Sequence, residues 1–220
     1  MNKKTAQYAP LLLLVFLAGG CKKDKADSVE QAAVRKCFAD YKAALLAEDG
    51  AKAKSLVDKG TLEYYGKMKK LALEATATET RKLKVVDKII VLLQRHMIPI
   101  EKLQKMTGEH LFVHGVDQGW IGREAMLSND IGDVTVNGSS ASGVHIVNGK
   151  ETPLHWDFRL EDDQWKIDLL PLMPHGEKAV NELIKDSGFS EEDFLFTVIQ
   201  NLSEKVVLET VWEPLQKKTK

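Results

Sequence analysis

The sequence predicts an α+β protein, in which N-terminal helices pack on a curved antiparallel sheet and further helices follow. Three observations support this prediction. Apolar residues recur at helical spacing within residues 28–117, and they alternate with polar residues within residues 131–170. Helical spacing returns from residue 176, which adds the C-terminal helices.

Capping residues delimit the first helices. Ser28, with Gln31 three places on, forms a capping-box pattern that opens a helix. We expect Asp49-Gly50 to end this helix, because glycine is common just after a helix. Shorter helices are expected near residues 51–58 and 61–75.

A longer helix is predicted over residues 79–97. Pro99 interrupts the pattern, and a last helical piece is expected within residues 100–117, with Thr107 as a possible cap. The helix of residues 79–97 carries one apolar stripe, formed by Val86, Ile89, Ile90, Leu93 and Met97.

The strands of the predicted sheet lie at about residues 131–170. Residues 131–138 form one strand, and residues 142–170 form three more, joined by two tight turns. Pairing Leu160 with Trp165 places the apolar residues of the last two strands on one face.

The turn before the third strand decides which side chains of the second strand face the core. We expect a three-residue loop at Asn148–Lys150. This loop would place Val144 and Ile146 on the apolar face, since a shift of register by one residue moves every side chain to the opposite face.

Two helices close the predicted fold, one at residues 176–186 and one that opens at Ser190 and extends toward Trp212. The second helix is apolar around more than one stripe, so it needs cover on two sides. That cover comes either from the domain itself or from a partner or second copy.

The order of elements over residues 28–170 and the segment DDQWKIDLL, residues 162–170, resemble the nuclear-transport-factor-two and ketosteroid-isomerase superfamily. The segment is similar to the acidic turn and Trp-Lys-hydrophobic-Asp strand of its small bacterial lipoproteins. This resemblance implies a cone-shaped α+β fold around a curved sheet. The helices after residue 176 depart from the minimal family pattern and could cover the opening of the cone.

Residues 1–20 are predicted to be a signal peptide. Lys3 and Lys4 precede an apolar run that is too short to span a bilayer. The stretch LAGGC, residues 17–21, resembles the lipobox of bacterial lipoproteins, although Ala18 stands where leucine is commonest. The alternative is an ordinary secretory signal with an incidental cysteine.

The lipobox resemblance implies that Cys21 is acylated and attaches the protein to a lipid bilayer. Lys22, in place of aspartate, then implies sorting to the outer membrane, with the domain facing the periplasm of a bacterium with two membranes. The predicted organisation is a lipidated tether at residues 21–27, a single α+β domain at residues 28–215 and a charged tail at residues 216–220.

Composition narrows the possible functions. The formal net charge of −1 does not suggest a nucleic-acid partner. The charge is unevenly distributed, because residues 59–105 hold 11 Lys and Arg against 5 Asp and Glu, whereas residues 151–213 hold 5 against 15. These parts either attract each other or form two solvated faces. Cys37, the other cysteine, lies at apolar helical spacing and is expected to be buried.

Four polar residues of the predicted sheet are candidates for a pocket or a polar-face cluster: His155, Asp157, Arg159 and Asp168. In the predicted register, Asp157 lies opposite Asp168. Two carboxylates beside a histidine could act as general acid and base or hold a metal. The alternative is a solvated, salt-bridged sheet face.

His110 and His114, four residues apart, are a weak candidate for zinc, because a helix would place both imidazoles on one side. Two histidines need further ligands, so we expect neither a metal nor another cofactor. No catalytic residue is assigned.

The sequence therefore favours a membrane-anchored, non-catalytic binding or scaffolding module for an envelope protein or a small ligand. The alternatives are a small pocket enzyme of isomerase or hydrolase type, and a protective lipoprotein that acts as an inhibitor or immunity protein.

Overall fold

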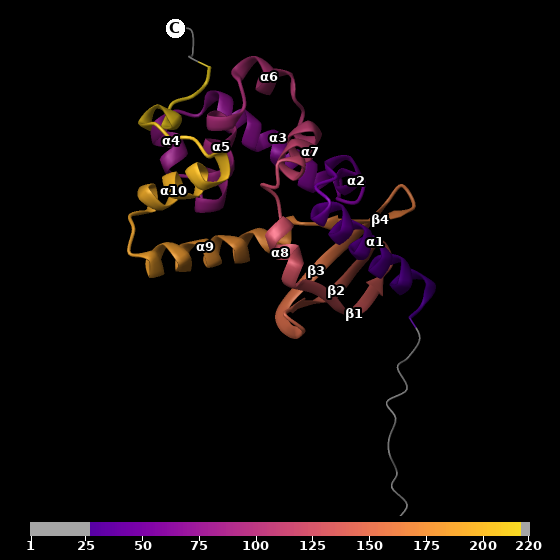
Figure 1. Cartoon of the computed structure of the whole chain (residues 1–220). Helices are drawn as coiled ribbons and strands as arrows, with labels where there is room; N and C mark the ends of the chain where they lie inside the picture. The colour runs from indigo at the N-terminus through magenta and orange to yellow at the C-terminus, as the bar shows by residue number, and fades with distance from the viewer. Residues whose placement is uncertain (1–26, 217–220) are drawn as a thin grey trace, which may run out of the picture.

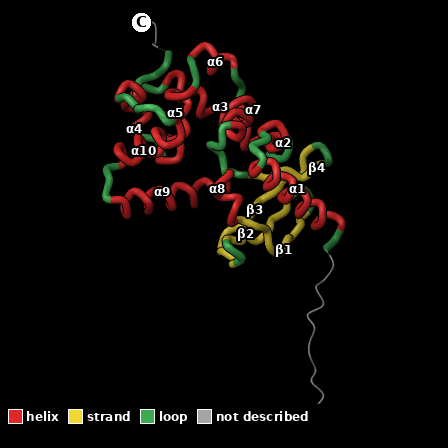
Figure 2. The backbone as a smooth tube through the Cα atoms, viewed as in Figure 1, coloured by secondary structure: helices red, strands yellow, loops and turns green. Residues whose placement is uncertain are grey.

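The computed structural model describes residues 27–216 and has the predicted α+β class. Within these residues, helices come first, a four-stranded antiparallel sheet follows, and further helices close the chain (Figures 1 and 2). The predicted order of elements is confirmed.

Caps begin most helices before the sheet. The Ser28–Gln31 capping box opens α1 as predicted, and Thr107 caps α7. Asp49, however, does not help to end α1, which stops at Leu46; its side chain accepts a hydrogen bond from Lys52 N and caps α2. The helices are α1 (Val29–Leu46), α2 (Gly50–Lys54), α3 (Lys59–Glu74), α4 (Ala77–Arg81), α5 (Val85–Met97), α6 (Ile100–Lys105), α7 (Gly108–Asp117) and α8 (Arg123–Ser128).

The single helix predicted over residues 79–97 is two helices, α4 and α5. Thr76 caps α4 together with Glu79. Lys84 gives α5 no side-chain cap. The carboxylate of Glu177 instead accepts hydrogen bonds from the N–H groups of Val85 and Val86, at 3.0 and 3.1 Å. A residue far along the chain therefore stabilises the start of α5.

The sheet is a meander in the order β1-β2-β3-β4. Leu160 pairs with Trp165, as predicted. Helix α1 lies against the sheet (Figure 1). It packs on the apolar face, where the rings of Phe38 and Trp156 lie 5.1 Å apart. The strands are β1 (Asn129–Asn137), β2 (Ser140–Val147), β3 (Lys150–Glu161) and β4 (Gln164–Asp168).

The predicted face of β2 is wrong. Val147 pairs with Lys150, so the turn consists of only two residues, Asn148 and Gly149, both with positive φ. The register also shifts between Val144 and Ile146, opposite which β3 has two extra residues. Val144 consequently lies opposite His155 on the polar face. The buried residues of β2 are Ala141, Gly143 and His145.

The C-terminal elements are η1 (Leu170–Leu172), α9 (Met173–Ser187), α10 (Glu191–Ser203) and η2 (Glu209–Trp212). Ser190 caps α10 through Asp193 N, as its position predicts. The helix ends at Ser203 and does not extend to Trp212, because Glu204 takes a left-handed conformation with a φ of 55°.

The core consists of three neighbouring clusters of buried side chains. The first cluster joins α1, α2 and the sheet. The second joins the four helices α3, α5, α6 and α7, and the third joins α5, α10 and η2. Tyr65 packs against the first and second clusters, and Trp120 against the second and third. Cys37 is buried in the first cluster, which confirms its predicted location.

Arg95 connects the last turns of α3 to the C-terminal segment. Its guanidinium is buried and donates to the carbonyl oxygens of Leu71, Ala72 and Ala75, and to those of Val211 and Trp212. Burial lowers the pKa of Arg95 to about 10. The cation adds donors at the end of α3, where Leu71 and Ala72 also accept from the backbone N–H groups of Ala75 and Leu215.

Candidate functional site

The polar residues of the sheet lie together, in the predicted register. Asp157 is paired with Asp168 across β3 and β4. The Arg159 atoms Nε and Nη2 both lie 3.0 Å from Asp168 Oδ2. The alternative of a solvated, salt-bridged face therefore holds for the salt bridge, whereas Asp168 itself is only 4% exposed. The chain leading into η1 covers it, and Leu170 N donates to its Oδ1 at 3.1 Å.

His155 and Asp157 line an open pocket together with His175, which sequence reasoning missed. Burial and the neighbouring Asp168 carboxylate raise the pKa of Asp157. Both histidines are exposed, and among the described residues no hydrogen bond joins either ring to Asp157. The pocket therefore has proton-transfer groups but no oriented acid–base pair.

The two histidines of the candidate zinc pair make separate contacts within the protein. His110 Nδ1 accepts a hydrogen bond from Thr107 N and so completes the cap of α7. The His114 ring lies edge-on to Trp120, with centroids 5.1 Å apart, and burial lowers its pKa. Residues 27–216 contain no group of three metal-ligating side chains at which an ion could bind.

Cys21, the predicted lipid-attachment site, lies outside the described residues. Within residues 27–216, no helix is both long enough and apolar enough to cross a bilayer.

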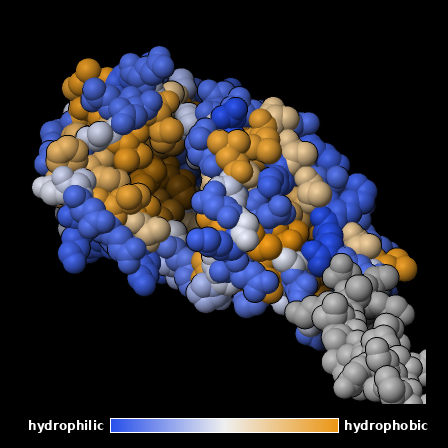
Figure 3. All heavy atoms as spheres, turned by 60° about the horizontal axis from the view of Figure 1, so that its bottom comes forward, coloured by the Kyte–Doolittle hydropathy of each residue, from blue (hydrophilic) through white to orange (hydrophobic). Residues whose placement is uncertain are grey.

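An apolar cleft lies beside α5 and encloses about 270 Å³. Figure 3 shows a hollow bordered by apolar side chains. Four residues of the predicted α5 stripe line the cleft: Val86, Ile89, Ile90 and Leu93. Only Leu93 of these is fully buried, because α5 turns a different set of residues toward the packed core: Val85, Lys88, Val91, Leu92 and Arg95.

The opposite wall comes from α7 and the chain that follows it. Leu111, Gly115, Trp120 and Ile121 line this side. A Cβ atom at Gly115 would lie 2.6 Å from Ile121 Cδ1, so glycine allows the chain to fold back against α7. Met173 of α9 and Leu202 of α10 also line the cleft.

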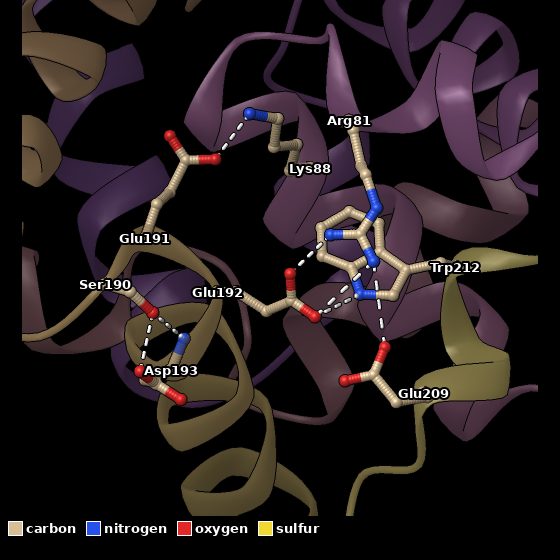
Figure 4. Close-up of polar contacts among 8 residues, drawn as sticks. All are labelled: Arg81, Lys88, Ser190, Glu191, Glu192, Asp193, Glu209 and Trp212. Carbon is tan, nitrogen blue, oxygen red and sulfur yellow. Dashed lines mark hydrogen bonds and ion pairs between the residues drawn. The ribbon is translucent and has the colours of Figure 1, made fainter.

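An ion-pair cluster attaches α10 to α4 (Figure 4). Arg81 pairs with Glu192, and its guanidinium carbon lies 4.1 Å from the centroid of the Trp212 ring. Arg81 Nη2 also lies 3.7 Å from Glu209 Oε2. The hydrogen bond from Arg81 lowers the pKa of Glu192.

A second pair joins Lys88 of α5, which is almost buried, to Glu191 of α10. Both pairs link the basic part of the chain, residues 59–105, to the acidic part, residues 151–213. They support the interpretation that the two parts attract each other. Together they hold α10, one of the elements that line the cleft.

Gln94 is a polar exception in the cleft. It lines the cleft and is only 4% exposed, and its Oε1 has no hydrogen-bond partner among the described residues. None of the lining residues is charged or is a histidine. The cleft is therefore suited to apolar groups.

Sequence reasoning missed this cleft, although it identified the α5 stripe. The available signal was that α5 has apolar residues on several sides at once, which requires cover from more than one direction. The sequence does not say whether that cover is complete.

No family model matches this chain, and neither the curated proteins nor the solved structures include a significant match.

Proposed function

We propose that this protein is a lipid-anchored envelope lipoprotein whose domain is a non-catalytic binding module, with the cleft beside α5 as its binding site. The observation that carries the proposal is the exclusively uncharged, mostly apolar lining of a concave space of about 270 Å³. Such a lining, with few polar groups, is typical of small-ligand sites.

Filling the cleft tests this proposal. Ile90→Trp would occupy much of the space, whereas Leu127→Trp makes a comparable change on α8, where Leu127 is 62% exposed. With naphthalene as an uncharged probe, we expect Ile90→Trp to weaken binding at least about tenfold and Leu127→Trp to leave it unchanged. Equal binding by both variants would refute the cleft as the site.

The anchor in this proposal is acylated Cys21, and the compartment is the periplasmic face of the outer membrane. The LAGGC stretch supports both. Metabolic labelling with palmitate, followed by membrane fractionation, tests them: the wild-type chain should be labelled in the outer-membrane fraction, and Cys21→Ser should lose both the label and the membrane association.

We infer further that the sheet is curved and that it forms, with α1, the cone of the nuclear-transport-factor-two and ketosteroid-isomerase superfamily. The two register shifts support curvature, because bulges bend strands. One lies at Ile131–Val134 in β1, and the other lies in β3, opposite Val144–Ile146. A flat sheet in an experimental structure would contradict this inference.

The pocket at His155, Asp157 and His175 favours a second candidate function, a small acid–base enzyme. Its support is the raised pKa of Asp157, since active sites often displace the pKa of a carboxyl. Asp157→Asn should then abolish turnover in a hydrolase or isomerase screen, while Asp162→Asn, in the exposed β3–β4 turn, should retain it. An inactive wild-type protein would refute this candidate.

A further inference from the structure

The amide of Gln94 is the polar group of the cleft that a ligand could meet with a hydrogen bond. Its Oε1 is buried and unpartnered among the described residues, although buried acceptors in folded proteins nearly always have a partner. The last side-chain torsion of glutamine is broad, so the amide can turn toward the cleft at little cost. A ligand group that meets it would replace the missing hydrogen bond.

A hydroxyl group suits this amide best. The amide offers both a carbonyl acceptor and an N–H donor, and a hydroxyl can donate to the first or accept from the second. The other polar side-chain groups of the lining, the phenol of Tyr65 and the indole of Trp120, are also uncharged.

A charged ligand group does not suit the cleft. The lining contains no aspartate, glutamate, lysine, arginine or histidine that could compensate a carboxylate, phosphate or ammonium. Moving an ion into such surroundings without a partner has a large desolvation cost.

The size of the cleft favours a compact ligand. Its volume of about 270 Å³ is just below the range of about 300–1,000 Å³ that is usual for small-molecule pockets. One or two fused rings fit this space, whereas a complete membrane lipid with two acyl chains does not.

We propose that the cleft binds a compact, uncharged, apolar molecule with one hydroxyl group, and that Gln94 forms a hydrogen bond with this hydroxyl. This proposal rests on the proposed function, because it specifies the ligand class of the same cleft. Gln94 is thus the specificity-determining residue, and the aliphatic side chains of α5 provide most of the contact area.

Two matched probes test the role of Gln94. 1-Naphthol carries the hydroxyl, and 1-methoxynaphthalene has the same rings but no hydroxyl donor. Equilibrium dialysis of the full-length protein in lipid nanodiscs, corrected with empty nanodiscs, gives both affinities. We expect 1-naphthol to bind about fivefold more tightly than 1-methoxynaphthalene, as one net hydrogen bond implies.

Gln94→Leu should abolish this preference and retain the binding of 1-methoxynaphthalene. Gln104→Leu, an exposed glutamine on α6, should behave as the wild type. Because Gln94→Leu removes an unsatisfied group, its melting temperature should not fall; if it does not fold, Gln94→Met replaces it in the same comparison.

The outcomes separate the two proposals. Equal binding of both probes to the wild type, or a preference that survives Gln94→Leu, overturns the hydroxyl proposal and leaves the cleft as a binding site. If neither probe binds, or if Ile90→Trp does not weaken binding, both proposals are overturned.

Discussion

The sheet and the helical C-terminal part bury their apolar residues to different degrees. Beneath α1, the side chains of Phe38, Trp156 and Ile167 are at most 2% exposed. Around the cleft, Val86 and Ile89 are only half-buried, and α9 has no fully buried residue. A helix lying on a sheet forms two continuous layers, whereas several helices around α5 meet incompletely and leave a cleft. The closed region is suited to stability and the open region to binding.

The largest effect should come from truncating the closed core. Phe158→Ala removes a ring that is 1% exposed and should lower the free energy of unfolding by about 3–5 kcal/mol. Ile90→Ala, at the half-buried cleft, should cost only about 1 kcal/mol, because it removes less buried area. Urea unfolding measures both; similar losses would contradict the difference between the two regions.

The helical part depends on polar contacts as well as apolar ones. Arg95→Met removes the donor of the Ala75 and Trp212 carbonyl oxygens, and should destabilise the protein by about 3 kcal/mol. Lys36→Met, on an exposed surface of α1, should change stability by less than about 0.5 kcal/mol. Thermal unfolding compares them, and a neutral Arg95→Met would show that water replaces the lost donors.

Acid should weaken the attachment of α10. The pKa of Glu192 is lowered from 4.5, mainly by the hydrogen bond from Arg81. A carboxylate with a lowered pKa contributes stability above its ordinary pKa, and this stability is lost as the pH falls through the folded-state value. At neutral pH, the free energy of unfolding of the wild type should therefore exceed that of Glu192→Gln by at most about 1 kcal/mol. The two values should converge as the pH falls below 4.5.

Glu209 provides a control for this prediction, because its contribution to stability should change with pH in the opposite direction. Glu209 is exposed, but slight desolvation and the adjacent Glu192 raise its pKa, so its titration favours the folded state as the pH falls. Urea unfolding across the acid range should show Glu209→Gln losing this gain. A parallel pH response of the two variants would contradict the assignment.

The last prediction concerns the reactivity of the Cys37 thiol. Burial raises the pKa of its thiol to about 12, so very little thiolate is present at neutral pH. In a Cys21→Ser background, a thiol reagent should label Cys37 at least about a hundredfold more slowly than a cysteine introduced by Leu202→Cys in the cleft. Comparable labelling rates would show that the sheet region opens readily.

Local sequence patterns were sufficient where a few neighbouring residues decide the structure. Ser28 and Gln31 predict the start of α1, because both partners of the cap lie within one turn. Alternation predicts that Leu160 pairs with Trp165, because a slip would expose a whole apolar face. An Asn-Gly pair is also a local signal for a two-residue turn, and the three-residue loop expected at Asn148–Lys150 reversed the predicted face of β2.

Other features depend on residues that are distant in the chain. Glu177 stabilises the start of α5 from α9, and this contact has no signal in the sequence around Val85. The α5 stripe shows the limit most clearly. Periodicity determines which side chains share a face of a helix. Only the packing of α7, α9 and α10 decides whether that face is closed into a core or left open as a cleft beside Gln94.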